Sequence, residues 1–156
     1  MTPLIGHIAC CIDDTPASEK ALAHAREIAD ATGARLTLVH AGPFPLLVDE
    51  VDGREVVRRE DLNAASRAWL ERRARDVPGA ATAFVQGVAG PAVCDWAADA
   101  GVDLLVTGGC NGRVRGLLLG SFSRHVVEHA PCPVLVVRRH PPVREGRRRA
   151  REEGIP

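Results

Sequence analysis

The stretch Asp103-Leu-Leu-Val-Thr-Gly-Gly-Cys-Asn-Gly112, together with the Gly116-Leu-Leu-Leu-Gly120-Ser121 that follows it, is the most informative part of this chain. The apolar run after Asp103 is typical of a buried strand, and the glycines end that strand in a turn. Glycines let the backbone approach a bound anion closely, and the N-terminus of a helix offers it free N–H groups. The stretch therefore predicts a strand–turn–helix unit that can cradle a phosphate. A plain loop followed by a helix cap has the same pattern and stays the alternative.

On either side of this unit, short apolar runs alternate with segments of helical periodicity. Thr15 and Pro16 suit the first positions of a helix that Gly33 ends. We predict strands over residues 4–12, 35–41, 81–87, 102–107 and 133–138, and helices over 16–32, 54–76, 91–100 and 121–129. The helix over 54–76 has a rough apolar face made of Val57, Leu62, Ala65, Trp69 and Leu70. Strands that alternate with helices predict an α/β fold, a parallel sheet with helices on both faces.

The composition is typical of a single globular domain in the reducing cytoplasm. Of the 156 residues, 46% are hydrophobic but only 3% are aromatic, so the core must consist of Ala, Val and Leu. The 20 basic and 20 acidic side chains balance, which argues against general nucleic-acid binding. No apolar run reaches the ~20 residues that span a bilayer, and no secretory signal is visible. The five cysteines form no C-x-x-C pair, so we expect no disulfide framework.

The end of the chain differs in composition from the rest. Residues 140–156 are rich in Arg, Glu and Pro and nearly lack apolar side chains. Such a segment cannot bury enough apolar surface to offset the entropy lost on ordering. We therefore expect the folded domain to occupy residues 1–139 and residues 140–156 to form a disordered charged tail.

The order of these segments resembles the universal stress protein family over residues 4–139. The resemblance rests on Ile8-Ala-Cys-Cys-Ile-Asp13, Leu117-Leu-Leu-Gly120-Ser121 and His129-Ala-Pro-Cys-Pro-Val-Leu-Val-Val137, with further matches at 17–22, 34–40 and 102–106. It implies a Rossmann-like, open twisted sheet of five parallel strands in the order 3-2-1-4-5. Strands one and four are then neighbours at a topological switch point, where open α/β sheets bind ligands.

The resemblance also implies a nucleotide site. Nucleotide-binding members carry Gly-x2-Gly-x9-Gly-[Ser/Thr] after strand four. Here Gly108 with Asn111 leaves eight residues before Gly120, and Gly109 with Gly112 leaves seven, so the loop is one or two residues shorter. By the same resemblance Asp13 lies near the ribose, the phosphates and Mg²⁺. The predicted nucleotide-binding residues are Cys11, Asp13, Ala41, Gly108, Gly109, Asn111, Gly112, Gly120, Ser121 and Phe122, with Cys11 and the Ala41 backbone on the adenine side.

Two functional hypotheses follow. The first is a cytoplasmic module that binds ATP, with Mg²⁺, and has a regulatory role in the stress response. Since no Ser-His-Asp set, P-loop lysine or carboxylate pair can be placed at the cradle, we expect no enzyme activity beyond slow ATP hydrolysis. The second is an interaction protein that binds no nucleotide and acts as a homodimer. Its interface would be the apolar edge of the last strand, which consists of Val134, Leu135, Val136 and Val137.

Four further features have a simpler structural explanation as well as a functional one. Cys110 lies in the glycine turn, where a helix N-terminus would lower its thiol pKa and favour a redox role. Cys10 and Cys11 are adjacent and suit small buried side chains. His125 and His129 are spaced i, i+4 on one helix, but no third ligand is evident and we expect no metal site. Asp13 could serve only to cap the first helix, but its position at the switch point favours a role in ligand binding.

Overall fold

The structure of the protein is a computed structural model that describes residues 4–42, 59–109 and 120–138. Its strands form one parallel sheet in the order β3-β2-β1-β4-β5. The strands are β1 (His7–Cys11), β2 (Arg35–Ala41), β3 (Ala81–Val85), β4 (Leu104–Gly108) and β5 (Val134–Val137). The helices are α1 (Pro16–Thr32), α2 (Arg59–Arg75), α3 (Ala89–Asp99) and α4 (Ser121–His129). The predicted fold class and strand order are confirmed.

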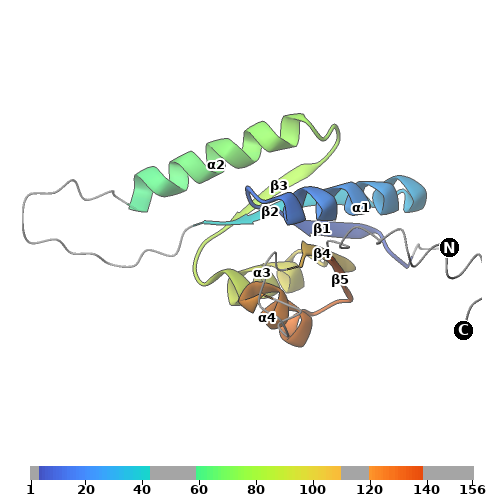
Figure 1. Ribbon diagram of the computed structural model, residues 1–156. Helices are drawn as coiled ribbons and strands as arrows, with labels where there is room; N and C mark the ends of the chain where they lie inside the picture. The colour runs from blue at the N-terminus through green and yellow to red at the C-terminus, as the bar shows by residue number, and fades with distance from the viewer. Residues whose placement is uncertain (1–3, 43–58, 110–119, 139–156) are drawn as a thin grey trace, which may run out of the picture.

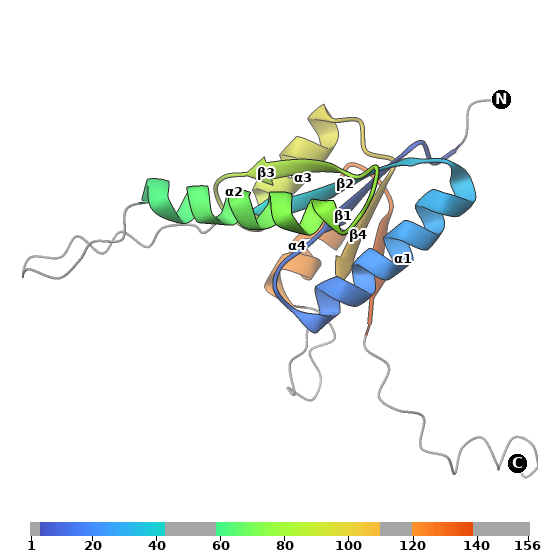
Figure 2. The same cartoon turned by 90° about the horizontal axis from the view of Figure 1, so that it is seen from above.

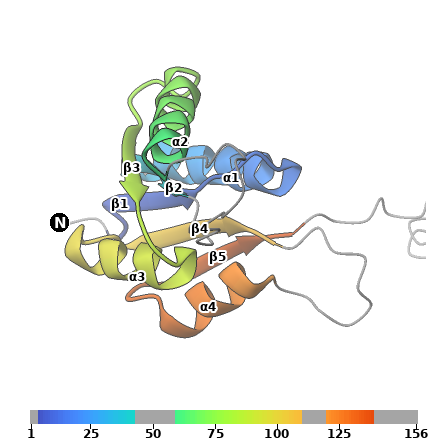
Figure 3. The same ribbon diagram turned by 90° about the vertical axis from the view of Figure 1, so that its left-hand side faces the viewer.

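The helices cover both faces of the sheet. In Figure 1, α1 and α2 lie above the sheet and α3 and α4 below it, and the view in Figure 3 shows the same two layers. Seen from above in Figure 2, α1 runs over the central strands while part of α2 extends past the sheet. None of the helices in the described part of the chain is long and apolar enough to span a membrane.

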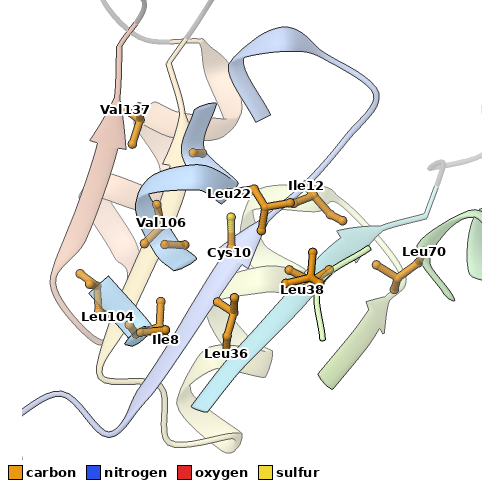
Figure 4. Packing of buried hydrophobic residues seen from close by; sticks show 14 residues of the cluster. Ile8, Cys10, Ile12, Leu22, Leu36, Leu38, Leu70, Leu104, Val106 and Val137 are labelled. Atoms are coloured by element: carbon orange, nitrogen blue, oxygen red, sulfur yellow. The ribbon is translucent and has the colours of Figure 1, made fainter. Parts of the chain in front are cut away.

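The core consists of two aliphatic layers, one on each side of the sheet. The central strand β1 contributes to both, with Ile8 and Cys10 on the α1 side and Ala9 on the α3 and α4 side. Figure 4 shows Ile8 and Cys10 beside Leu36 and Leu38 of β2. Side chains alternate along a strand, so a continuous apolar run is what a strand buried on both faces requires.

The ends of α1 are as predicted, and those of α3 are not. Thr15 is the N-cap of α1, and its hydroxyl accepts a hydrogen bond from the Ser18 N–H at 3.3 Å. Gly33 ends α1 in the left-handed conformation, with a φ of 71°. Helix α3 begins at Ala89 rather than at residue 91, after Val88 as N-cap.

The apolar face predicted for the second helix is right only in its C-terminal part. Leu70 is 2% exposed and Trp69 packs against the core, but Leu62 is 39% exposed and Ala65 is also exposed. The α2 helix packs on the edge strand β3 and on β2, so its first turns have little sheet beneath them. Val57 and the predicted start of this helix lie outside the described residues, as do the predicted tail and its boundary.

Gly108 allows α1 to approach β4 closely. A Cβ atom built on Gly108 would lie 2.7 Å from the carbonyl carbon and oxygen of Ala17 and 2.9 Å from its Cβ. These distances are shorter than van der Waals contact, so a side chain here would force the backbone of α1 or β4 to move. This glycine, predicted as part of a phosphate cradle, therefore has a packing role as well.

Gly90 has a similar role between α3 and α4. A Cβ atom on Gly90 would lie 2.7 Å from Cδ2 of His125. The ring of His125 also stacks on that of His129, with centroids 4.2 Å apart and an interplanar angle of 16°. The described residues contain no group of three or more His, Cys, Asp or Glu that could hold a metal ion. In this arrangement His125 is a packing residue of the α3–α4 contact.

Candidate functional site

A cleft of about 380 Å³ opens where β1, β2 and β4 end. Its volume falls within the range of small-molecule sites, roughly 300–1,000 Å³. The ends of these three strands form its floor, and the first turns of α1, α3 and α4 complete its lining. The chain crosses from one face of the sheet to the other between β1 and β4, so the cleft lies at the topological switch point.

The cleft brings together most of the predicted site residues. Cys11, Asp13, Ala41, Gly108, Gly109, Gly120 and Phe122 line it. Ser121 is the exposed first residue of α4 and lies beside the lining residue Gly120. Asn111, Gly112 and Cys110 lie outside the described residues. Sequence reasoning missed Thr15, Ser18, Thr107 and Ser123, which also line the cleft; their signal is a hydroxyl residue at a strand end or in the first turn of a helix.

Asp13 is exposed, and its neighbours orient it. Its carboxylate oxygen Oδ1 accepts a hydrogen bond from the Thr15 hydroxyl, and its N–H donates to Ser18 Oγ at 2.9 Å. Thr15 and not Asp13 is therefore the N-cap of α1. The second carboxylate oxygen accepts no hydrogen bond from a described residue, so it can accept one from a ligand hydroxyl or bind a cation.

The start of α4 provides hydrogen-bond donors without a side-chain cap. Gly120 is the N-cap, and no side chain of a described residue bonds to the first N–H groups of the helix. Ser123 Oγ donates to the Gly108 carbonyl at 2.9 Å, and Gly109 N–H donates to Val137 O at 2.8 Å. These bonds hold the end of β4 against α4 and β5. Uncapped N–H groups and the positive end of a helix dipole favour an anion at this position.

The backbone of Ala41 faces the cleft because β1 ends before β2 does. Ile12 N–H donates to Val39 O, and Gly42 N–H donates to Val85 O, both at 2.9 Å. Successive residues of a strand direct their backbone groups to opposite neighbours, so Val39 and Ala41 face β1, while His40 and Gly42 face β3. The described chain provides no strand residue opposite Ala41 on the β1 side, and its N–H and C=O remain available as a donor and an acceptor.

Of the two cysteines of β1, Cys10 is buried and Cys11 is partly exposed to the cleft. Burial raises the pKa of Cys10 to about 12 and raises the pKa of Cys11 well above its ordinary value. Because the thiolate is the reactive form, neither residue suits nucleophilic chemistry. Cys11 therefore contributes an uncharged, polarisable wall to the cleft.

The fold is an open α/β sheet with helices on both faces and a cleft at its topological switch point. The family model of the universal stress protein family matches residues 5–138. A universal stress protein of Thermus aquaticus is 38% identical over 129 residues, which cover 81% of this chain and 93% of the relative. The chain belongs to the universal stress protein family.

Solved structures of the family have the same fold. The universal stress protein UspA from Lactobacillus plantarum superposes with a TM-score of 0.65 and 28% identity, covering 86% of this chain and 98% of the other. A universal stress protein solved in complex with cAMP superposes with a TM-score of 0.62 and 26% identity, covering 86% of this chain and 97% of the other.

Proposed function

We propose that this protein binds an adenine nucleotide in the cleft and acts as a cytoplasmic regulatory module in a stress response. The observation that carries the proposal is that two sets of backbone groups without partners among the described residues lie in one cleft: the N–H and C=O of Ala41, and the first N–H groups of α4. The first suits the edge of a base and the second suits a phosphate. A family member solved in complex with cAMP supports this class of ligand.

The base fits the β2 side of the cleft. Along one edge, adenine offers the acceptor N1 and the donor 6-amino group, which match the N–H and C=O of Ala41. Guanine offers a donor N1–H and an acceptor O6 at the same places, so the match is lost. Cys11 and Phe122 would flank the base, since both line the cleft with apolar or polarisable groups.

The phosphates fit the opposite side. Gly108, Gly109 and Gly120 line that part of the cleft, Ser121 begins α4, and the unpaired oxygen of Asp13 would bind a ribose hydroxyl or a Mg²⁺ ion carried by the phosphates. Asn111 and Gly112 belong to the proposed cradle by their position in the sequence. Among the described lining residues Asp13 is the one carboxylate, so no pair of carboxylates accompanies the phosphates, and the proposal contains no catalytic step.

Titration of the purified protein with ATP, ADP and AMP, with and without Mg²⁺, tests the proposal by calorimetry and by thermal unfolding. A ligand at 100 times its Kd stabilises the native state by about 2.7 kcal/mol. Gly120→Val is the decisive variant, because Gly120 has a φ of −70° and a ψ of 166° that valine also adopts. The added side chain should abolish the stabilisation, while Ala31→Val on the exposed end of α1 should retain it. Unchanged ATP stabilisation in Gly120→Val contradicts the cradle.

The second candidate function, a homodimer joined through β5, is favoured by the position of that strand. β5 is an edge strand, and Val134, Leu135 and Val136 are only partly buried. An apolar edge with free backbone groups favours pairing with another strand. Val136 is outside both core clusters, so Val136→Lys should turn a dimer into a monomer in light scattering without unfolding it. Val127→Lys, at a half-exposed apolar position on α4, is the control. A dimer that survives Val136→Lys contradicts pairing through β5.

A further inference from the structure

The side chain of His40 binds the carbonyl group on which the β1–β2 ladder would otherwise continue. Nδ1 of His40 lies 2.8 Å from the carbonyl oxygen of Ile12. A carbonyl only accepts hydrogen bonds, so Nδ1 carries the proton and donates. In a parallel ladder, the bond from Ile12 N–H to Val39 O is followed by one from Ala41 N–H to Ile12 O. That next bond is not formed between these described residues, and the His40 ring binds the carbonyl in its place.

The ring of His40 is held by aromatic neighbours from α2 and β3. Its centroid lies 4.8 Å from that of Trp69 and 6.2 Å from that of Phe84. The guanidinium of Arg67 lies 4.2 Å from the centroid of Phe84, a cation–π contact on that ring. A Cβ atom on Gly42 would lie 2.5 Å from Cζ of Phe84, so the backbone leaves room for this packing. His40 also lines the cleft, but Trp69 and Phe84, which hold its ring, do not, so the direction of the Nδ1–H group is set by neighbours outside the cleft.

We propose that His40 is a positioning residue for base recognition. By donating to Ile12 O, its side chain keeps the Ala41 N–H out of the ladder and available to an acceptor nitrogen of the base. This inference rests on the proposed function for its ligand, but the backbone arrangement that it describes exists without one. His40 itself needs no contact with the nucleotide.

Amide hydrogen exchange measured by NMR tests the backbone part without any ligand. In the wild-type protein the Ala41 amide should exchange rapidly with solvent. His40→Leu keeps an apolar side chain against Trp69 but removes the donor, so the Ala41 N–H should bond to Ile12 O and exchange at least about tenfold more slowly. His40→Asn retains a donor at the δ position and should restore fast exchange. His24→Leu is the matched control, since Nδ1 of His24 also lies 2.9 Å from a backbone carbonyl, that of Lys20, on the exposed side of α1.

Nucleotide selectivity tests the functional part. Inosine monophosphate carries an N1–H donor where AMP has the acceptor N1, so the wild-type protein should bind AMP about tenfold more tightly, the size of one hydrogen bond made or lost. In His40→Leu this ratio should fall to within about threefold, and in His40→Asn it should recover. The ratio is the decisive quantity, because a merely structural defect would weaken both ligands alike.

The outcomes separate this inference from the proposed function. If the wild-type protein binds no nucleotide, the proposed function is wrong, while the exchange rate of the Ala41 amide still decides whether His40 keeps it free. If Ala41 exchanges equally fast in the wild type and in His40→Leu, the role given to His40 is overturned. An equal loss of affinity for AMP and inosine monophosphate in His40→Leu also overturns it.

Discussion

Gly108, the last residue of β4, and the adjacent Gly109 should respond differently to replacement by alanine. Gly108→Ala places a methyl group 2.7 Å from the carbonyl carbon and oxygen of Ala17 and 2.9 Å from its Cβ. Two of these atoms belong to the backbone of α1, so no side-chain rotation can relieve the clash and the helix must shift from β4. Overpacking of this kind costs about 1–3 kcal/mol. We expect Gly108→Ala to lose about 2 kcal/mol, or roughly 4–8 °C in Tm for a chain of this length.

Gly109→Ala is the matched control one residue further along. A Cβ atom there meets Val137 O at 3.4 Å and side-chain carbons at 3.6 Å, which are ordinary contacts. Gly109 is not among the glycines with positive φ. The substitution also reduces the entropy of the unfolded chain, which stabilises proteins by about 0.4–1 kcal/mol at compatible positions. Its net effect should stay within about 0.5 kcal/mol of the wild type.

Urea unfolding in the absence of nucleotide, followed by circular dichroism and by the fluorescence of Trp69 and Trp96, measures both variants. Both glycines line the cleft, so a stability loss confined to Gly108→Ala would assign that residue to packing without reference to any ligand. The reasoning is refuted if Gly108→Ala is as stable as the wild type, or if Gly109→Ala loses an equal amount.

Three further predictions concern the charged and titratable groups. Burial and the neighbouring Arg35 guanidinium lower the pKa of His7 below 6.5 in the native state. Because the unfolded chain binds the proton at a higher pH than the native protein does, the urea midpoint should fall as the pH drops below about 6.5. In His7→Gln the midpoint should depend less on pH. A urea midpoint that rises as the pH drops below about 6.5 would show that the pKa of His7 is raised on folding, and would contradict this prediction. Burial raises the pKa of Cys10 to about 12. Iodoacetamide at pH 8 should therefore alkylate Cys10 at least about 100-fold more slowly in the native protein than in urea, as followed by mass spectrometry. Equal alkylation rates would contradict the burial of Cys10. Glu19→Gln removes the ion pair to Arg73 between α1 and α2, both partners being partly exposed, and should cost less than about 1 kcal/mol in urea unfolding; a loss above 2 kcal/mol would show that this pair does more than a surface contact.

The order of elements was predictable because its signals are local. The alternation of apolar runs and helical segments, the Thr15 cap and the Gly33 stop each depend on a few neighbouring residues. Where tertiary packing decides whether a side chain is buried, the local sequence pattern gave a wrong prediction. The apolar pattern at Leu62 and Ala65 predicted a buried face, but the edge position of β3 leaves those side chains exposed.

The candidate site was predictable only in outline. Strand ends such as Asp13 and Gly108 could be named from the sequence, because the carboxyl ends of parallel strands meet at one edge of the sheet. The bond from His40 to Ile12 and the contact of Gly108 with Ala17 join residues far apart in the chain, and no local pattern signals them. Asp103 illustrates the same limit: its carboxylate accepts from the N–H groups of Gly6 and His7 at 2.9 Å, at the opposite end of the sheet from the cleft.

The sequence by itself determined that this is a parallel α/β domain of the universal stress protein family, with an aliphatic core and glycines after its fourth strand. Periodicity and turn chemistry operate over a few residues, so they survive in the sequence whatever the chain packs against. Only the tertiary structure decided which of the predicted residues share the cleft, that Gly108 has a packing role, and that the Ala41 N–H makes no hydrogen bond to Ile12 in the described part of the chain. Those outcomes depend on the register of neighbouring strands and on distances between segments, and both are set when the helices close over the sheet.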